Sequence, residues 1–213
     1  MANRIGVIGS GIVGQTLANG FHKHGYAVMM GTNTAAKRDQ LGAMTSAQIG
    51  SFDETAQFGD IVVLATKGSA AEAAIAAAGP AHLRGKTVID TTNPIADAPP
   101  VNGVLKFFTT LDDSLMERLQ RRVPEARFVK AFSCVGNARM VNPDFKGTRP
   151  TMFICGNEAP AKTAVSGILD QFGWDVADMG AVEAARAIEP LCILWCIPGF
   201  RENSWTHALK LLR

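Results

Sequence analysis

The chain has 213 residues, 47% of them hydrophobic and 19% charged, and its formal net charge at neutral pH is +2. This length suits one domain with at most a small appendage, and the composition is that of a globular protein with a well-buried core. A nearly neutral chain argues against nucleic acid or a membrane surface as its partner. The amino terminus lacks the pattern of a signal peptide and no apolar run reaches about 18 residues, so we expect a cytoplasmic protein.

Short apolar runs alternate with helical stretches along most of the chain. Strands are predicted at residues 4–9, 26–31, 60–66, 87–94, 127–133, 151–156 and 174–180. Helices are predicted at residues 12–24, 69–79, 112–122 and 158–172, with a short one near 37–38 and a helical region from 181 onward that breaks at Pro198-Gly199. This alternation predicts an α/β fold with a doubly wound, mostly parallel sheet over residues 1–180 and a small helical C-terminal cap over residues 181–213.

The loosest segment of the chain is residues 95–110, which contains two prolines and Asn102-Gly103. It is either a plain surface loop or a loop that borders a ligand cleft, because loops at the carboxyl ends of parallel strands often build sites. The sequence leaves both alternatives open.

No metal site or acid–base constellation is evident. Cys134, Cys155, Cys192 and Cys196 form no Cys-x-x-Cys pair and have no histidines at zinc spacing. Cys192 and Cys196 lie one helical turn apart in an apolar segment and are interpreted as core thiols. The four histidines are scattered, and no Ser-His-Asp, Cys-His or paired-carboxylate pattern is found. We therefore expect neither a metal ligand set nor a catalytic side chain.

The first motif with a chemical meaning is a glycine turn. Gly9, Gly11 and Gly14 have G-x-G-x-x-G spacing, directly after the first predicted strand and at the start of the first predicted helix. In this context the first glycine permits the tight turn, the second lets a diphosphate approach the backbone, and the third lets helix and strand pack closely. Ser10 adds a hydroxyl. The motif predicts a Rossmann-type dinucleotide site with the diphosphate at the helix amino terminus.

The second strand indicates which dinucleotide binds. An NAD site usually has Asp or Glu at the end of this strand, whereas this chain has no acidic residue before Asp39. Thr32 and Asn33 offer neutral donors there, and Lys37 and Arg38 offer positive charge for a 2′-phosphate. Lys37 and Arg38 are otherwise simply the solvated start of a helix. The pattern favours NADP(H) over NAD(H).

The chain resembles the F420-dependent NADP oxidoreductases, which transfer hydride between NADPH and a deazaflavin, and is similar to the cytosolic oxidoreductase domain of the STEAP metalloreductases. The resemblance spans nearly the whole chain and is carried by "GVIGSGIVGQTLA", "VMMGTNTAAK", "DIVVLAT", "VIDTTNPI", "RFVKAFSCVGNARM", "MFICGNEAPAKTAV" and "DMGAVEAARAIEPL". The last three blocks, in this order, are more specific than the glycine motif.

The resemblance implies a set of cofactor-binding residues. The pyrophosphate would be held by the loop of Ser10, Gly11, Ile12 and Val13, and the 2′-phosphate by Thr32, Asn33 and Lys37. The rest of the cofactor would be bordered by Thr66, Lys67 and Gly68, by Asn93, Pro94 and Ile95, and near the nicotinamide by Phe132 and Asn137.

Three positions depart from the family pattern. Thr32-Asn33 stands where Ser-Arg is common, Lys67 where an apolar residue or proline is common, and Ser133 where the family has a histidine. A lysine at position 67 either binds an anionic acceptor or is an exposed surface lysine.

The resemblance implies direct hydride transfer between NADP(H) and a deazaflavin (coenzyme F420) or a flavin such as FMN or FAD, a reaction in which the cofactors carry the chemistry. Two alternatives are an NADP(H)-binding sensor without turnover and an NADPH-dependent reductase of a small organic substrate. The apolar segment 191–213 would cover the sheet, form a homodimer contact, or provide an aromatic wall for the acceptor.

Overall fold

The computed structural model describes residues 4–212 and contains a six-stranded parallel sheet in the order β3-β2-β1-β4-β5-β6. The strands are β1 (Arg4–Ile8), β2 (Ala27–Gly31), β3 (Gln48–Gly50), β4 (Ile61–Leu64), β5 (Thr87–Asp90) and β6 (Arg127–Lys130). Sequence order reverses direction between β1 and β4, which lie side by side. This is the topological switch point at which doubly wound folds bind their ligands.

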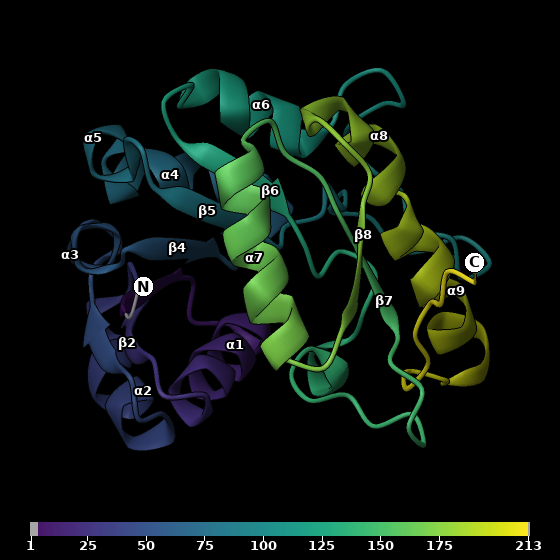
Figure 1. The fold of residues 1–213 in the computed structure, drawn as a ribbon, viewed down its shortest axis with the longest axis horizontal. Coiled ribbons are helices and arrows are strands. Elements are labelled where there is room, and N and C mark those ends of the chain that lie inside the picture. Colours follow the sequence, from purple (N-terminus) through teal and green to yellow (C-terminus); the bar gives the residue numbers. More distant parts are fainter. Residues whose placement is uncertain (1–3, 213) are drawn as a thin grey trace.

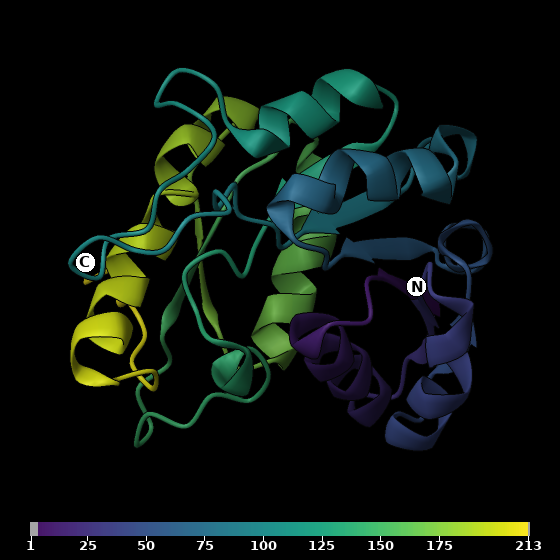
Figure 2. The same cartoon turned by 180° about the vertical axis from the view of Figure 1, so that it is seen from behind.

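Helices cover both faces of the sheet, as the predicted fold requires (Figures 1 and 2). On one face the core joins the strands to α1 (Ile12–Lys23) and α7 (Ala159–Gln171). On the other face it joins them to α3 (Phe52–Phe58), α4 (Ala71–Ala78), α5 (Pro80–Leu83), α6 (Leu115–Arg122) and α8 (Ala185–Ile188). The short α2 (Arg38–Met44) packs beside β3. The Rossmann-type α/β prediction is confirmed.

The last two predicted strands form a sheet of their own. Strands β7 (Thr151–Ile154) and β8 (Asp175–Asp178) pair in parallel, and the backbone N–H of Lys130 donates to the carbonyl of Cys155 where β6 passes close to the end of β7. The single continuous sheet that the alternating pattern suggested is therefore divided after β6. The division is a long-range feature, since the strand sequences themselves look alike.

The carboxyl-terminal region differs from the sequence prediction in two ways. Helix α9 (Leu191–Glu202) continues through Pro198 and ends at Asn203, which has a left-handed conformation. The predicted break is wrong because packing holds the helix together: Gly199 lies directly against the ring of Trp205. Residues 203–212 are also not helical. The end of this segment lies beside β7, where the N–H of Thr151 donates to the carbonyl of Leu209 and the N–H of Leu211 donates to the hydroxyl of Thr151.

Some short elements were not predicted, and several strands are shorter than predicted. Strand β3 and helices α3 and α5 form where the sequence predicts neither strand nor helix. Helix α3 nevertheless has a local signal, a capping box in which Ser51 and Glu54 bond each other's backbone N–H. The strand predicted at 87–94 ends at Asp90, because Asp90 then accepts hydrogen bonds from the N–H and the hydroxyl of Thr92 and turns the chain.

Candidate functional site

The glycine turn has the geometry that its spacing predicts. Gly9 has a φ of +122°, a conformation that side chains rarely adopt, and a Cβ added there would lie 2.4 Å from the carbonyl oxygen of Ala65. A Cβ on Gly14 would lie 2.0 Å from the carbonyl oxygen of Gly9, so both positions require glycine for the fold. Gly11 has nothing within 4 Å of an added Cβ. Space is therefore left open at the one glycine that a diphosphate would approach.

The amino terminus of α1 fits an anion. Gly11 is its N-cap, no side chain caps it, and its first turn contains no acidic residue. The first N–H groups of a helix have no partner within it and carry partial positive charge. Ser10 is half-buried, Val13 is half-buried beside the core, and Ile12 is 63% exposed at the surface. These residues suit the predicted pyrophosphate contact of a dinucleotide.

The end of β2 presents neutral and basic groups, as predicted. Thr32 is buried: its N–H donates to Gly50, and its hydroxyl accepts from the N–H of Thr34. Asn33 and Lys37 are exposed, and no ion pair of Lys37 is found among the side chains that the structure describes, which do not include that of Asp39. Arg38 instead lies 3.9 Å from Glu54. Lys37 is thus an exposed cation close to the end of β2, where a 2′-phosphate is predicted to bind.

A cavity of about 360 Å³ lies at the carboxyl ends of β4 and β5, beside the glycine turn. Five of its lining residues were predicted from the sequence: Thr66, Lys67, Gly68, Asn93 and Ile95. Five others were missed, although they flank the predicted ones in sequence: Ser69, Thr91, Thr92, Ala96 and Asp97. Because Ile95, Ala96 and Asp97 line this cavity, the segment 95–110 borders a cleft at its start.

Two close backbone contacts shape this cavity. A Cβ on Gly68 would lie 2.0 Å from the carbonyl oxygen of Asn93, so the loops after β4 and β5 touch here. The carbonyl of Pro94, which is buried, accepts a hydrogen bond from the N–H of Phe108. The predicted loop residues are therefore held by each other and by the segment 95–110.

Several buried polar atoms around the cavity have no protein partner. They are Thr66 Oγ1, Asn93 Oδ1 and Ser133 Oγ. The amide nitrogen of Asn93 donates to the carbonyl of Ser133, which fixes the side chain and leaves its oxygen free. Buried polar atoms are nearly always hydrogen-bonded, and unpaired ones at a cavity fit a polar ligand such as a nicotinamide ribose and carboxamide.

Phe132 and Asn137 do not line this cavity. Phe132 is 2% exposed, its ring packs near that of Phe172, and its φ is +63°, which is costly for a bulky residue. Asn137 begins a short 3₁₀ turn that packs beside α1. Strained backbone is common at functional sites, and the nicotinamide contacts of these two residues stay predictions.

The described residues contain no other class of site that would change this interpretation. No helix within residues 4–212 is long and apolar enough to cross a membrane. Among the same residues, no three His, Cys, Asp or Glu side chains group as a metal ligand set. The fold, the glycine turn and the neighbouring cavity at the carboxyl ends of β4 and β5 define a Rossmann-type dinucleotide-binding protein.

Comparison with known proteins narrows this class. Residues 4–94 match the family model for the coenzyme F420-dependent NADP oxidoreductases. Metalloreductase STEAP3 from Rattus norvegicus is 26% identical over 201 residues, which make up 92% of this chain and 38% of that protein. The chain therefore spans well under half the length of this relative.

Solved structures agree with the sequence matches. A protein from Arthrobacter sp. FB24, proposed to be an F420-dependent NADP reductase, is 29% identical with a TM-score of 0.92, and both chains are covered to 100%. A reductive aminase from Aspergillus terreus, solved in complex with NADPH, matches with a TM-score of 0.67 and 19% sequence identity. The match covers 94% of this chain and 62% of that one, and it shows only that the two proteins share a fold. These findings confirm the resemblance: in sequence and in fold the chain is similar to NADP-dependent oxidoreductases.

Proposed function

We propose that the protein transfers a hydride directly between NADP(H) and the ring of a deazaflavin or flavin, with coenzyme F420, FMN and FAD as the candidate acceptors. The observation that carries the proposal is the cavity at the carboxyl ends of β4 and β5. Its lining includes the unpaired atoms Thr66 Oγ1 and Asn93 Oδ1, and Thr66 lies beside Gly9 of the glycine turn. The cavity has a volume of about 360 Å³, which is within the usual range for small-molecule sites. It has room for a nicotinamide and part of an acceptor ring.

The residues present fit NADP(H). The N–H groups at the start of α1 would hold the diphosphate, and Lys37 the 2′-phosphate. At the nicotinamide end, the hydroxyl of Thr66 would donate or accept a hydrogen bond and Asn93 Oδ1 would accept one. The nicotinamide supplies the hydride when it is bound. The chain's part is to orient the two rings and exclude water, which needs no side-chain acid or base.

Lys67 supports an acceptor that carries an anionic group. It lines the cavity, is exposed, and has no ion pair within the part of the chain that the structure describes. Asp97 lines the same cavity and would disfavour a second anion close to it. A phosphate-bearing acceptor such as F420 or FMN satisfies Lys67 better than an uncharged substrate does.

The test is an acceptor screen. NADPH absorbance is followed while F420, FMN, FAD, a cyclic imine and a ketone are supplied in turn. We expect NADPH oxidation with F420 or a flavin, and a rise in the acceptor's KM in Lys67→Met with little change in NADPH affinity. Oxidation by the imine or ketone alone would favour a small-substrate reductase. Tight NADPH binding without turnover on any acceptor would favour a sensor.

We also propose that the protein forms a homodimer through α9. Leu194 and Phe200 on this helix are 56% and 45% exposed, and the loop around Gly103 lies against Arg201 of the same helix and exposes Val101. In the proposed dimer these exposed apolar side chains would be buried between the two copies. Light scattering after size exclusion should give twice the monomer mass, and Leu194→Asp should return the monomer. A monomeric wild type at micromolar concentration would refute the dimer.

A further inference from the structure

A buried ionic cluster lies directly behind the cavity. Lys130 is the last residue of β6 and stands in register with Asp90, the last residue of β5. Its ammonium lies 2.6 Å from a carboxylate oxygen of Asp90 and 2.9 Å from one of Glu189, which precedes α9. The three side chains are at most 2% exposed. The cluster thus joins two strand ends to the carboxyl-terminal helices.

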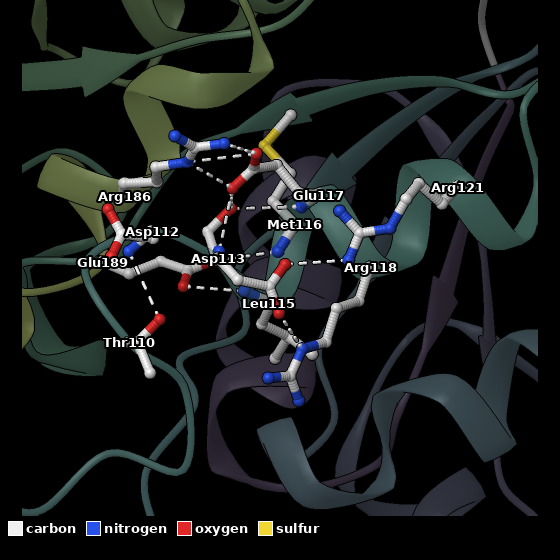
Figure 3. Close-up of polar contacts among 11 residues, drawn as sticks. Thr110, Asp112, Asp113, Leu115, Met116, Glu117, Arg118, Arg121, Arg186 and Glu189 are labelled. Atoms are coloured by element: carbon white, nitrogen blue, oxygen red, sulfur yellow. Dashed lines mark hydrogen bonds and ion pairs between the residues drawn. The ribbon is translucent and has the colours of Figure 1, made fainter.

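Each charge in this cluster is compensated. Burial alone would lower the pKa of Lys130, but the two carboxylates outweigh it and raise that pKa above the ordinary lysine value, so the ammonium stays charged. Glu189 accepts hydrogen bonds from the N–H groups of Leu115 and Met116, both at 3.0 Å, at the amino terminus of α6 (Figure 3). The positive end of that helix therefore supports the second carboxylate.

The cluster also fixes the wall of the cavity. The ammonium of Lys130 donates to the carbonyl of Thr92 at 2.8 Å. Asp90 accepts from the N–H of Thr92 at 2.9 Å and from its hydroxyl at 2.7 Å. Thr92 lines the cavity, and so does the next residue, Asn93, whose oxygen is unpaired. Three hydrogen bonds thus set the backbone from which Asn93 projects.

Such a buried cluster adds little net free energy to the stability of a fold. Burying ions costs desolvation that an apolar core would avoid, and apolar replacement of buried ion pairs is often neutral or stabilising. Within residues 4–212, Lys130 is the only lysine with a fully buried side chain. Its one hydrogen bond to backbone goes to a residue of the cavity wall. This placement indicates a role in geometry beyond stability.

We propose that Lys130 is a positioning residue for hydride transfer, which holds the turn of Thr92 and Asn93 against the nicotinamide end of the cofactor with help from Asp90 and Glu189. The expected effect on the rate of hydride transfer rests on the proposed function. The expected effect on NADPH affinity requires only that the protein binds NADP(H). By the same contacts, Glu189 couples the turn to α6 and to the start of α9.

The test compares two variants of the cluster with a matched control. Lys130→Met removes the ammonium at similar length, and Lys130→Met/Glu189→Gln does so while leaving the net charge of the cluster at minus one. The control is Glu117→Gln, which breaks the ion pair with Arg186 (Figure 3), another link between α6 and α8. Neither Glu117 nor Arg186 lines the cavity. Glu189→Gln alone decides the question if the Lys130 variants do not fold.

Two probes separate positioning from general stability. NADPH occupies the whole site, whereas adenosine 2′,5′-bisphosphate occupies only the adenosine end. We expect the cluster variants to weaken NADPH about tenfold and to leave adenosine 2′,5′-bisphosphate within about twofold. Glu189→Gln alone should weaken NADPH about threefold, because Asp90 still holds Lys130. With an active acceptor, single-turnover hydride transfer should fall about 10- to 100-fold, the usual effect of misplacement by about 1 Å. Glu117→Gln should change none of these values.

The outcomes are distinct. Equal losses for both ligands, or no loss for either, would overturn the positioning role and leave Lys130 as a structural residue. If none of the supplied acceptors supports NADPH oxidation by the wild type, the proposed function fails. The ratio of the dissociation constants for NADPH and adenosine 2′,5′-bisphosphate still tests the positioning role.

Discussion

Gly11→Ala should separate folding from cofactor binding. Gly11 has φ −72° and ψ 179°, which any residue adopts, and a Cβ there meets nothing within 4 Å. Alanine is a poorer N-cap residue than glycine, so the free energy of unfolding should fall by only about 0.5–1 kcal/mol. The protein should fold as the wild type does.

Binding should respond differently, because the added methyl group would stand where the diphosphate approaches the backbone. A hydrogen bond to a charged group is worth about 1.5–3 kcal/mol, and about 1.4 kcal/mol corresponds to a factor of ten. Loss of one such bond therefore predicts an increase of about 10- to 100-fold in the Kd for NADPH. Fluorescence titration with NADPH measures it, and thermal unfolding without ligand gives the stability.

Gly14→Ala is the matched control. Its Cβ would lie 2.0 Å from the carbonyl oxygen of Gly9, so it should destabilise the fold by about 1–3 kcal/mol, as overpacking does. The reasoning is refuted if Gly11→Ala binds NADPH within twofold of the wild type, or if it loses as much stability as Gly14→Ala.

Three further changes test other parts of the site and fold. Lys37→Ala should weaken NADPH about tenfold and leave NADH unchanged in parallel titrations; equal effects on both would contradict the 2′-phosphate contact. Gly68→Ala should push the loop of Asn93 outward. It should weaken NADPH binding at least about tenfold and affect the binding of adenosine 2′,5′-bisphosphate less. Unchanged NADPH affinity would show that the loop contact is dispensable. The hydrogen-bonded guanidinium of Arg186 lowers the pKa of Glu117 from 4.5 to about 2, so this carboxylate stabilises the fold fully above about pH 4.5 and loses that effect as pH falls toward 2. Because Arg186 is 39% exposed, Glu117→Gln should cost only about 1–2 kcal/mol at pH 7, and urea unfolding should show this difference shrink between pH 5 and pH 3; a constant difference would refute it.

The sequence determined the features that depend on neighbouring residues. The order of strands and helices could be predicted because apolar runs and helical periods are local signals. Five of the six strands of the main sheet were located, and β3 was missed. The conformation of the glycine turn could be predicted because the contacts that require Gly14 lie within one strand–turn–helix unit. The absence of an acid before Asp39 likewise concerns a single strand end.

Only the tertiary structure decided how distant segments meet. The separate β7–β8 sheet, the passage of α9 through Pro198 and the extended tail beside Thr151 all depend on packing partners that no local pattern contains. The same holds for the buried cluster: "RFVKAFS" reads as an ordinary strand, and the ion pairs of Lys130 come from Asp90 and Glu189, on other elements. Burial and ion pairing follow from three-dimensional distance, so the charge that holds the cavity wall could be found only once the chain was folded.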